Sequence, residues 1–280
     1  AFPITGRISK VPEKMYLGGS MHRMPVNMAL RMVRPLTDTG SCAPAVFYKR
    51  YAKLWCRSFD AQGVVSSSYK SNLYAEGGRA MLVDGTAVIY RAYYKLLDGN
   101  GDWVLTIFTA LSLIVDVLEL FPSHVAVVFD HNGTNFRHTL YPSYKSNRPP
   151  TPDTIVQGLQ YLKASIRAMS IKVIEVPGVE ADDVIGTLTM RSVNAGYKVR
   201  IVSPDKDFFQ ILSPSVRLLR IAPRGVEMTS FGIEDFGERY GELRPSQFVD
   251  LMALVGDKAD NIPGVDGIGD VHAHKLISKF

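Results

Sequence analysis

From about residue 79 onward, short apolar runs alternate with stretches in which apolar residues recur every three to four positions. The short runs are rich in Val, Ile and Leu, as expected for buried strands, and they cover about 80–84, 124–130, 171–176 and 198–203. The periodic stretches predict helices over about 88–97, 103–121, 154–169 and 180–194. Strands that alternate with helices in this way predict an α/β fold with a mostly parallel central sheet flanked by helices.

The pattern changes in the middle and towards the end of this region. Residues 131–155 interrupt the alternation with prolines and predict an irregular excursion. Residues 216–221 and 226–229 are predicted to pair as a hairpin, followed by a helix over 233–240. In the last segment we expect a helix over 247–255, a glycine-containing turn and a final helix.

Residues 1–78 show no sustained period and differ in charge from the rest of the chain. They hold eleven Lys/Arg against four Asp/Glu, whereas residues 79–280 hold twenty-one against twenty-three. The pI near 9.1 therefore reflects the first segment and does not indicate a basic nucleic-acid-binding domain. Few acids with scattered Arg and Ser are typical of a transit peptide, which predicts an organellar location, mitochondrion or chloroplast. The alternative is a disordered basic arm.

The overall composition, 46% hydrophobic and 21% charged over 280 residues, is ordinary for a globular protein with a substantial core. The longest apolar stretch, 103–121, is broken by Thr, Ser, Asp and Glu, so it predicts a buried helix rather than a membrane span, and no membrane partner is expected. Cys42 and Cys56 form neither a metal-binding pattern nor a disulfide framework.

Acidic residues gather at the carboxyl ends of the four predicted parallel strands, the edge where ligands bind in open α/β sheets. Seven carboxylates fall there: Asp84, Asp130, Glu180, Asp182, Asp183, Asp205 and Asp207. Asp257 and Asp260, one helical turn apart, can face the same place.

Such a gathering of like charges costs several kcal/mol unless cations lie between the acids. Taken alone, the cluster Glu180, Asp182 and Asp183 has a simpler interpretation as an acidic, capped helix start. Taken together, the nine carboxylates predict a site for hard divalent ions, and the absence of His and Cys from the set disfavours zinc. Their number favours two Mg²⁺ ions, as in phosphoryl displacement, with Mn²⁺ as a substitute.

Two further stretches suggest a nucleic-acid substrate. Between residues 136 and 148, Lys and Arg alternate with Phe and Tyr, which suits phosphates and stacked bases. Gly264, Gly267 and Gly269 stand where backbone N–H groups can approach a phosphate, although an ordinary tight turn explains them equally well.

Six ordered motifs now carry a resemblance to a known family: LVDG, VVFD, FR…YKSNRPP, GVEADDVIGTL, PDKDFFQ and GDKADNIPGVDGIG. From about residue 80 to the end, the chain resembles the 5′ nuclease superfamily, most closely the 5′→3′ exonuclease domain of bacterial DNA polymerase I, in a stand-alone, organelle-type form. The resemblance implies a PIN-like 5′ nuclease fold over 79–244, with a helical arch at about 131–160. It also implies a helix–hairpin–helix DNA-binding segment, shortened, over 245–280.

The resemblance also implies roles for individual residues. A first metal site would use mainly Asp130, Glu180, Asp182 and Asp183. A second would draw on Asp205, Asp207, Asp257 and Asp260, partly through water, and Asp84 belongs to the same set. Asp182 and Asp183 would thereby serve catalysis, together with three cations near the scissile phosphate: Lys145, Arg137 and Arg91. DNA contacts are implied for Tyr144, as a stacking ring, and for Lys145, Arg148, Gly264, Gly267 and Gly269.

The chain departs from the family pattern after Gly269, where Asp270, Val271 and His272 replace the usual Lys and Thr. The loss of a lysine predicts a weaker grip on duplex DNA. We expect a monomeric, Mg²⁺-dependent 5′→3′ exonuclease and flap endonuclease acting on DNA 5′ ends in replication and repair. The alternatives are an RNase H-like 5′ nuclease acting on RNA–DNA hybrids, and an inactive structure-specific DNA-binding module.

Overall fold

The computed structural model describes residues 78–95, 103–120, 122–221 and 228–279. The predicted transit-peptide-like segment, 1–78, lies outside the described residues except for Gly78. Within the described ranges, no helix combines the length and the apolar character that a membrane span requires.

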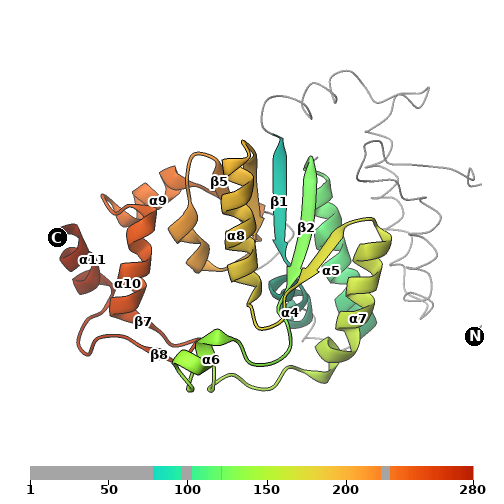
Figure 1. The fold of residues 1–280 in the computed structure, drawn as a ribbon, viewed down its shortest axis with the longest axis horizontal. Coiled ribbons are helices and arrows are strands. Elements are labelled where there is room, and N and C mark those ends of the chain that lie inside the picture. Colours follow the sequence, from blue (N-terminus) through green and yellow to red (C-terminus); the bar gives the residue numbers. More distant parts are fainter. Residues whose placement is uncertain (1–77, 96–102, 121, 222–227, 280) are drawn as a thin grey trace, which may run out of the picture.

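A six-stranded sheet forms the centre of the fold, in the order β3-β2-β1-β4-β5-β6 (Figure 1). The first five strands run parallel and β6 pairs antiparallel with β5, which confirms the predicted mostly parallel sheet and its hairpin. The bounds are β1 Arg79–Asp84, β2 His124–Phe129, β3 Lys172–Glu175, β4 Lys198–Val202, β5 Val216–Ile221 and β6 Met228–Phe231.

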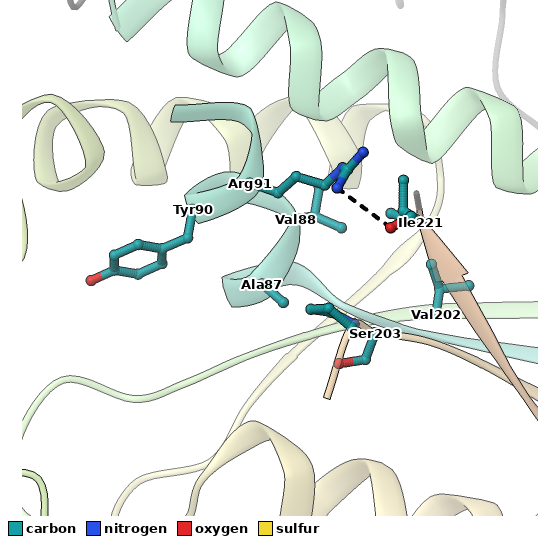
Figure 2. A pocket seen from close by; sticks show the side chains of 8 residues that line it. Ala87, Val88, Tyr90, Arg91, Val202, Ser203 and Ile221 are labelled. Atoms are coloured by element: carbon teal, nitrogen blue, oxygen red, sulfur yellow. Dashed lines mark hydrogen bonds between the residues drawn. The ribbon is translucent and has the colours of Figure 1, made fainter. Parts of the chain in front are cut away.

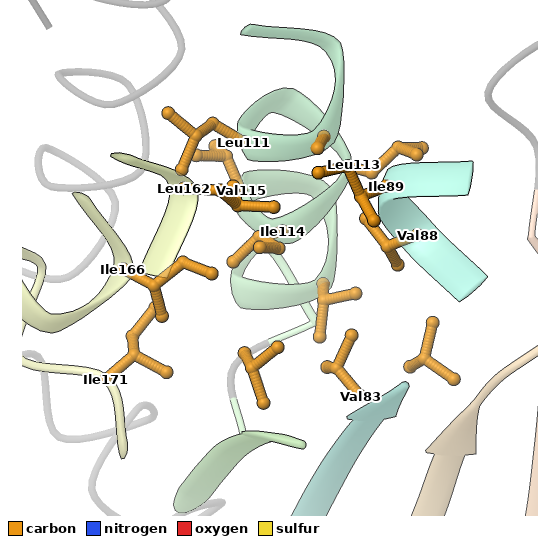
Figure 3. Packing of buried hydrophobic residues seen from close by; sticks show 14 of the residues in the cluster. Val83, Val88, Ile89, Leu111, Leu113, Ile114, Val115, Leu162, Ile166 and Ile171 are labelled. Carbon is orange, nitrogen blue, oxygen red and sulfur yellow. The ribbon is translucent and has the colours of Figure 1, made fainter. Parts of the chain in front are cut away.

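Helices cover both faces of the sheet. One face carries α4 (Gly85–Lys95), α5 (Trp103–Leu118) and α7 (Asp153–Ala168), whose apolar sides form a core with Met81 and Val83 of β1 (Figure 3). The other face carries α8 (Ala181–Asn194), packed on the alternate residues Ala80 and Leu82. Both faces of β1 are therefore buried, which explains its uninterrupted apolar run.

Four of the C-terminal elements pack into the core on the α8 face: η1 (Lys206–Ile211), α9 (Ile233–Tyr240), α10 (Phe248–Val255) and α11 (Asp270–Lys279). The short elements η2 (Pro245–Gln247), β7 (Gly256–Asp257) and β8 (Ile262–Pro263) lie between them in the chain. Phe209 lies at the centre of their packing, with its ring 4.5 Å from that of Phe231 and 5.4 Å from that of Phe248. The segment 245–279 is thus fixed to the α/β domain by buried aromatic rings.

The sequence pattern did not predict the short helix α6 (Phe136–Leu140) in the 131–155 excursion. A capping box closes its start: the Arg137 N–H donates to Asn135 Oδ1 at 2.9 Å, and the Asn135 N–H donates to His138 Nδ1 at 3.2 Å. The prolines that follow α6 led us to predict an irregular segment, although the capping residues of α6 were present in the sequence. The hairpin β7–β8, with only two residues in each strand, was also missed.

Gly264 directly follows β8 and packs against the C-terminal end of α10, where there is no room for a side chain. A Cβ on Gly264 would overlap the carbonyl oxygen of Val255, which is backbone and has little freedom to move. We expect Gly264→Ala to lower the free energy of unfolding by about 1–3 kcal/mol, the range for forced overpacking. Gly269→Ala is the matched control, because a Cβ there meets nothing within 4 Å. Urea unfolding measures both, and equal stabilities would contradict the prediction.

Candidate metal centre and nucleic-acid interface

The carboxylates lie at the point where the strand order reverses. The chain moves from β1 outward to β2 and β3 and then returns to β4 on the other side of β1. In open α/β sheets, ligands bind at the carboxyl ends of the strands beside such a reversal. Asp84 ends β1, Asp130 follows β2, and Asp205 lies just beyond β4, so three adjacent strands direct acids to this edge.

Asp84 is held rigidly between two elements. Its Oδ1 accepts the Ala87 N–H of α4 at 2.8 Å, and its Oδ2 accepts the Ser203 hydroxyl at 2.9 Å. Burial raises the pKa of Asp84 to about 6, and the charges of Asp130 and Asp205 contribute in the same direction. Ser203 was not predicted as a site residue, although its place directly after β4 was visible in the sequence.

The start of α8 presents three acids towards one point. Glu180, Asp182 and Asp183 each offer an oxygen, and these oxygens lie within 4.8 Å of one another. The Glu180 side chain makes no capping hydrogen bond, and the Ala181 N–H is instead accepted by Asp130 Oδ1 at 2.7 Å. Simple capping therefore does not account for the Glu180 carboxylate.

A second group of acids continues the cluster. Burial raises the pKa of Asp207 to about 6, and the charges of Asp205, Asp257 and Asp260 raise it further. Among the described residues, the buried Oδ1 of Asp207 has no hydrogen-bond partner. A buried carboxylate oxygen without a donor, within an all-oxygen ligand set, fits a hard divalent cation better than zinc.

Cations from the predicted arch segment, 131–160, reach this cluster directly, and they precede Asp153, where α7 begins. The Arg137 guanidinium makes a bidentate ion pair with the Asp183 carboxylate, with N–O distances of 2.6 and 2.8 Å. Its Nη1 also lies 3.0 Å from Glu180 Oε2. The Lys145 amine contacts Glu180 Oε1 and lies 3.8 Å from Asp260 Oδ2. The acids of both groups are therefore partly neutralised by side chains of the chain itself.

Arg148 pairs with Asp260 at the exposed side of the cluster, and Lys206 lies 3.9 Å from Asp257. Arg148 is about half exposed, at 51%, whereas Lys145 is 21% exposed. Of the predicted DNA-contacting cations, Lys145 is thus the one held deeper between the acids.

Tyr144 differs from its predicted role as a stacking ring. Its side chain is buried, and its hydroxyl lies 2.8 Å from Glu180 Oε2 and 3.0 Å from Asp260 Oδ2. Burial and these two carboxylates raise its pKa well above the usual range, so the hydroxyl keeps its proton. Tyr144 connects the two acid groups, and the exposed rings nearby are those of Phe136 and Tyr141.

Arg91 lies beside the cluster rather than within it. It lines a cavity of about 290 Å³ with Tyr90, Ser203 and Ile221, and its Nη1 donates to the Ile221 carbonyl at 3.4 Å (Figure 2). Burial lowers the pKa of Arg91. Ser203 lines this cavity and also donates its hydroxyl to Asp84, so the cavity borders the carboxylate cluster.

The glycine segment forms a tight connection between β8 and α11. The Val265 N–H donates to the Leu254 carbonyl at 2.8 Å, and the Ile268 N–H donates to the Val265 carbonyl at 3.0 Å. Gly267 has φ +78°, which favours glycine, while Gly264 is required by close packing. These two predicted phosphate-contacting glycines therefore also have structural reasons to be glycine, and Gly269 directly precedes α11.

Asp182 lies close to other carboxylates, so we expect that replacing it with a neutral side chain stabilises the fold. Burial raises its pKa to about 7, and the charges of Glu180 and Asp183 add to this effect. Because the pKa in the fold exceeds that in the unfolded chain, the carboxyl destabilises the fold increasingly as pH rises to about 7, and the cost is constant at higher pH. We expect Asp182→Asn to raise the melting temperature in EDTA by about 2–6 °C at pH 8 and by less at pH 5. Calorimetry at both pH values measures this, and an equal or larger gain at pH 5 would contradict it.

Comparisons with known proteins agree with this geometry. The 5′-3′ exonuclease N-terminal resolvase-like domain model matches residues 79–241, and the 5′-3′ exonuclease C-terminal SAM fold model matches residues 243–280. Thermostable DNA polymerase I of Thermus thermophilus is 38% identical over 211 residues, which are 74% of this chain and 25% of that protein. DNA polymerase I of Bacillus caldotenax is 37% identical over 207 residues, 72% of this chain and 23% of that protein. The chain spans about a quarter of the length of these relatives.

Solved structures share the fold. T5 5′-exonuclease, solved with divalent metal ions (zinc), has a TM-score of 0.61 and 25% identity, covering 72% of this chain and 75% of that one. The bacteriophage T5 D15 flap endonuclease, solved as a pseudo-enzyme-product complex with DNA and metal ions, has a TM-score of 0.60, 24% identity and the same coverage. The predicted PIN-like 5′ nuclease fold is confirmed. From the two family matches and the curated relatives together, the chain belongs to the 5′–3′ exonuclease family.

Proposed function

We propose that the protein is a Mg²⁺-dependent 5′→3′ exonuclease and structure-specific flap endonuclease, hydrolysing phosphodiester bonds near DNA 5′ ends in replication and repair. The observation that carries this proposal is the joining of two acid groups and the arch cations in one cluster at the sheet edge. Family membership and the metal- and DNA-bound T5 structures support it.

We further propose that the carboxylates hold two divalent ions, the first at the cluster that Glu180, Asp182 and Asp183 form at the start of α8. The first would be held by Asp130, Glu180, Asp182 and Asp183, and the second by Asp205, Asp207, Asp257 and Asp260, with Asp84 at the common edge. When bound, such ions supply activation of water and neutralisation of the phosphate in an in-line displacement. Oxygen donors of this kind accept Mg²⁺ and also Mn²⁺.

The chain's own residues provide the remaining functions. Arg137 and Lys145 place positive charge beside the acids, where a scissile phosphate would bring further negative charge. Fixed cations of this kind stabilise charge that develops in the transition state. Arg148, exposed at the edge, can contact a flanking phosphate, and Phe136 and Tyr141 offer exposed rings to unpaired bases.

A direct test uses a 5′-flap DNA labelled at the 5′ end, with Mg²⁺, Mn²⁺ or EDTA, and the same structure with an RNA flap strand. We expect cleavage at the flap junction with either metal, none in EDTA, and faster cleavage of DNA. Faster cleavage of the RNA–DNA substrate would favour the hybrid-specific alternative. Binding without metal-dependent cleavage of either substrate would instead identify an inactive binding module.

We further propose that residues 1–78 direct the protein to an organelle, on the basis of their charge and composition. A fusion of these residues to a fluorescent protein tests this, and diffuse fluorescence would contradict it. The proposed monomeric state can be measured by light scattering.

A further inference from the structure

Two segments that are far apart in the sequence lie side by side next to the acid cluster. One is residues 143–148 of the predicted arch segment, and the other is the connection 258–261 between β7 and β8, which lies beside α6 in Figure 1. Their main chains meet at one hydrogen bond, in which the Lys145 N–H donates to the Asp260 carbonyl at 2.9 Å. The position of Lys145 therefore depends on a segment more than one hundred residues away.

Two asparagines secure this contact from opposite sides. Asn261 donates from its amide to the Ser143 carbonyl at 2.8 Å and to Ser146 Oγ at 3.0 Å. Asn147 donates in return to the Lys258 carbonyl at 2.7 Å. Each segment thus contributes one side-chain amide to the other, with Lys145 at the centre of the bonded region. We call this pair of amides the asparagine clamp.

The backbone at both segments has an unusual conformation. Among the described residues, non-glycine residues with positive φ are Lys145 at +55°, Ser170 at +59° and Asn261 at +58°. Asparagine adopts this left-handed conformation readily, whereas lysine does so at a cost. Residues in such conformations persist where the surrounding structure determines them, and they cluster at functional sites. Two of the three face each other across the clamp.

This conformation determines where the Lys145 side chain lies. Its amine contacts Glu180 and lies 3.8 Å from Asp260 Oδ2, and it packs 4.8 Å from the centre of the Tyr144 ring. A return of Lys145 to the ordinary right-handed conformation would redirect its side chain. Displacements of about 1 Å at a reacting centre can cost as much as 100-fold in rate.

We propose that Asn261 and Asn147 are positioning residues that act through Lys145, holding its ammonium at the carboxylate cluster. This inference rests on the proposed nuclease function, because it assigns the clamp a role in the same reaction. Neither asparagine is a ligand or a phosphate contact in this proposal. The clamp also joins residues 143–147 to the connection 258–261, which precedes β8.

The kinetic test compares Asn261→Ala, Asn261→Gly and Asn147→Ala on the 5′-flap DNA with Mg²⁺. We expect Asn261→Ala to lower kcat about tenfold with KM changed less than threefold, because positioning rather than binding is lost. Asn261→Gly keeps a left-handed backbone without the amide and is expected to lie between Asn261→Ala and the parent. The matched control is Asn194→Ala, an exposed asparagine at the end of α8, which should leave kcat unchanged.

A double-mutant cycle separates positioning from a general structural effect. If Asn261 acts through Lys145, then Asn261→Ala should lower kcat by less than twofold in the Lys145→Ala background. A full tenfold loss in that background, or parent-like kcat for Asn261→Ala, would overturn the inference.

A readout independent of activity comes from hydrogen exchange of the intact protein in EDTA. The Lys145 N–H should exchange at least tenfold faster in Asn261→Ala and Asn147→Ala, while amides within α8 keep their protection. An unchanged exchange rate of the Lys145 N–H would show that the two asparagines do not hold the Lys145 backbone in place. If the parent protein cleaves neither substrate, the proposed function fails, and exchange still decides whether the clamp holds Lys145.

Discussion

Replacement of Asp182 and Asp183 by alanine is expected to reduce flap cleavage at least about 1000-fold, the largest effect anticipated for this protein. These carboxylates lie at the start of α8, and each offers an oxygen to the same point as Glu180. Because α8 is anchored through Ala181 and Ile185 on its buried side, the variant should keep the fold. Single-turnover cleavage with saturating Mg²⁺ measures the loss.

Binding of flap DNA by this double variant should remain equal or become tighter. Removing two negative charges lowers the repulsion of phosphates, and Arg137 loses one of its two carboxylate partners, Asp183, while Glu180 remains. Fluorescence anisotropy in EDTA measures this affinity. Glu238→Gln, at an exposed acid on α9, is the matched control and should change neither cleavage nor binding. Cleavage by the double variant within tenfold of the parent would remove Asp182 and Asp183 from the metal site.

The acid cluster itself was predictable from the sequence because it depends on topology. Parallel strands bring their carboxyl ends to one edge, so Asp84, Asp130 and Asp205 could be placed together before any coordinates. The long helices and the strands followed from apolar periodicity in the same way. What periodicity could not supply was the short elements α6 and β7–β8, which are stabilised by capping and by contacts rather than by a buried stripe.

The contacts of Tyr144 could not be predicted from its place in the sequence motif. An aromatic ring in a basic segment suggests stacking on a base, but this ring is buried and its hydroxyl connects Glu180 to Asp260. These partners lie 36 and 116 residues away along the chain. Such distant contacts leave no local pattern, and the same reason explains why the asparagine clamp could not be anticipated.

The ionised carboxylates of this cluster also lower the stability of the fold. Burial and neighbouring acids raise the pKa values of Asp84, Asp182 and Asp207, so the fold carries carboxylates that are unfavourable when ionised. The paired arch cations offset part of this cost, and bound divalent ions would offset more. We therefore regard the acids as retained for chemistry at the expense of stability.

Loss of the Lys145 ammonium is expected to lower kcat by about 100–1000-fold, the range for removing one group that stabilises developing charge. Lys145 is the arch cation held between the two acid groups, with Glu180 on one side and Asp260 on the other. Lys145→Ala removes this charge from the place where the scissile phosphate is expected. Single-turnover rates at saturating DNA measure the effect on kcat without a contribution from binding.

Arg148→Ala provides the contrast, because Arg148 is half exposed and pairs with Asp260 at the rim. A cation in that position should bind a flanking phosphate, so its loss is expected to raise KM a few-fold, leave kcat within about threefold, and reduce the salt dependence of binding. Lys145→Ala should instead change the salt dependence little, because its amine is less exposed than Arg148 and lies between two carboxylates, Glu180 and Asp260. If kcat falls by the same factor in both variants, then the deeper position of Lys145 does not contribute to catalysis. If Lys145→Ala raises KM alone, Lys145 is a binding residue and its catalytic assignment is wrong.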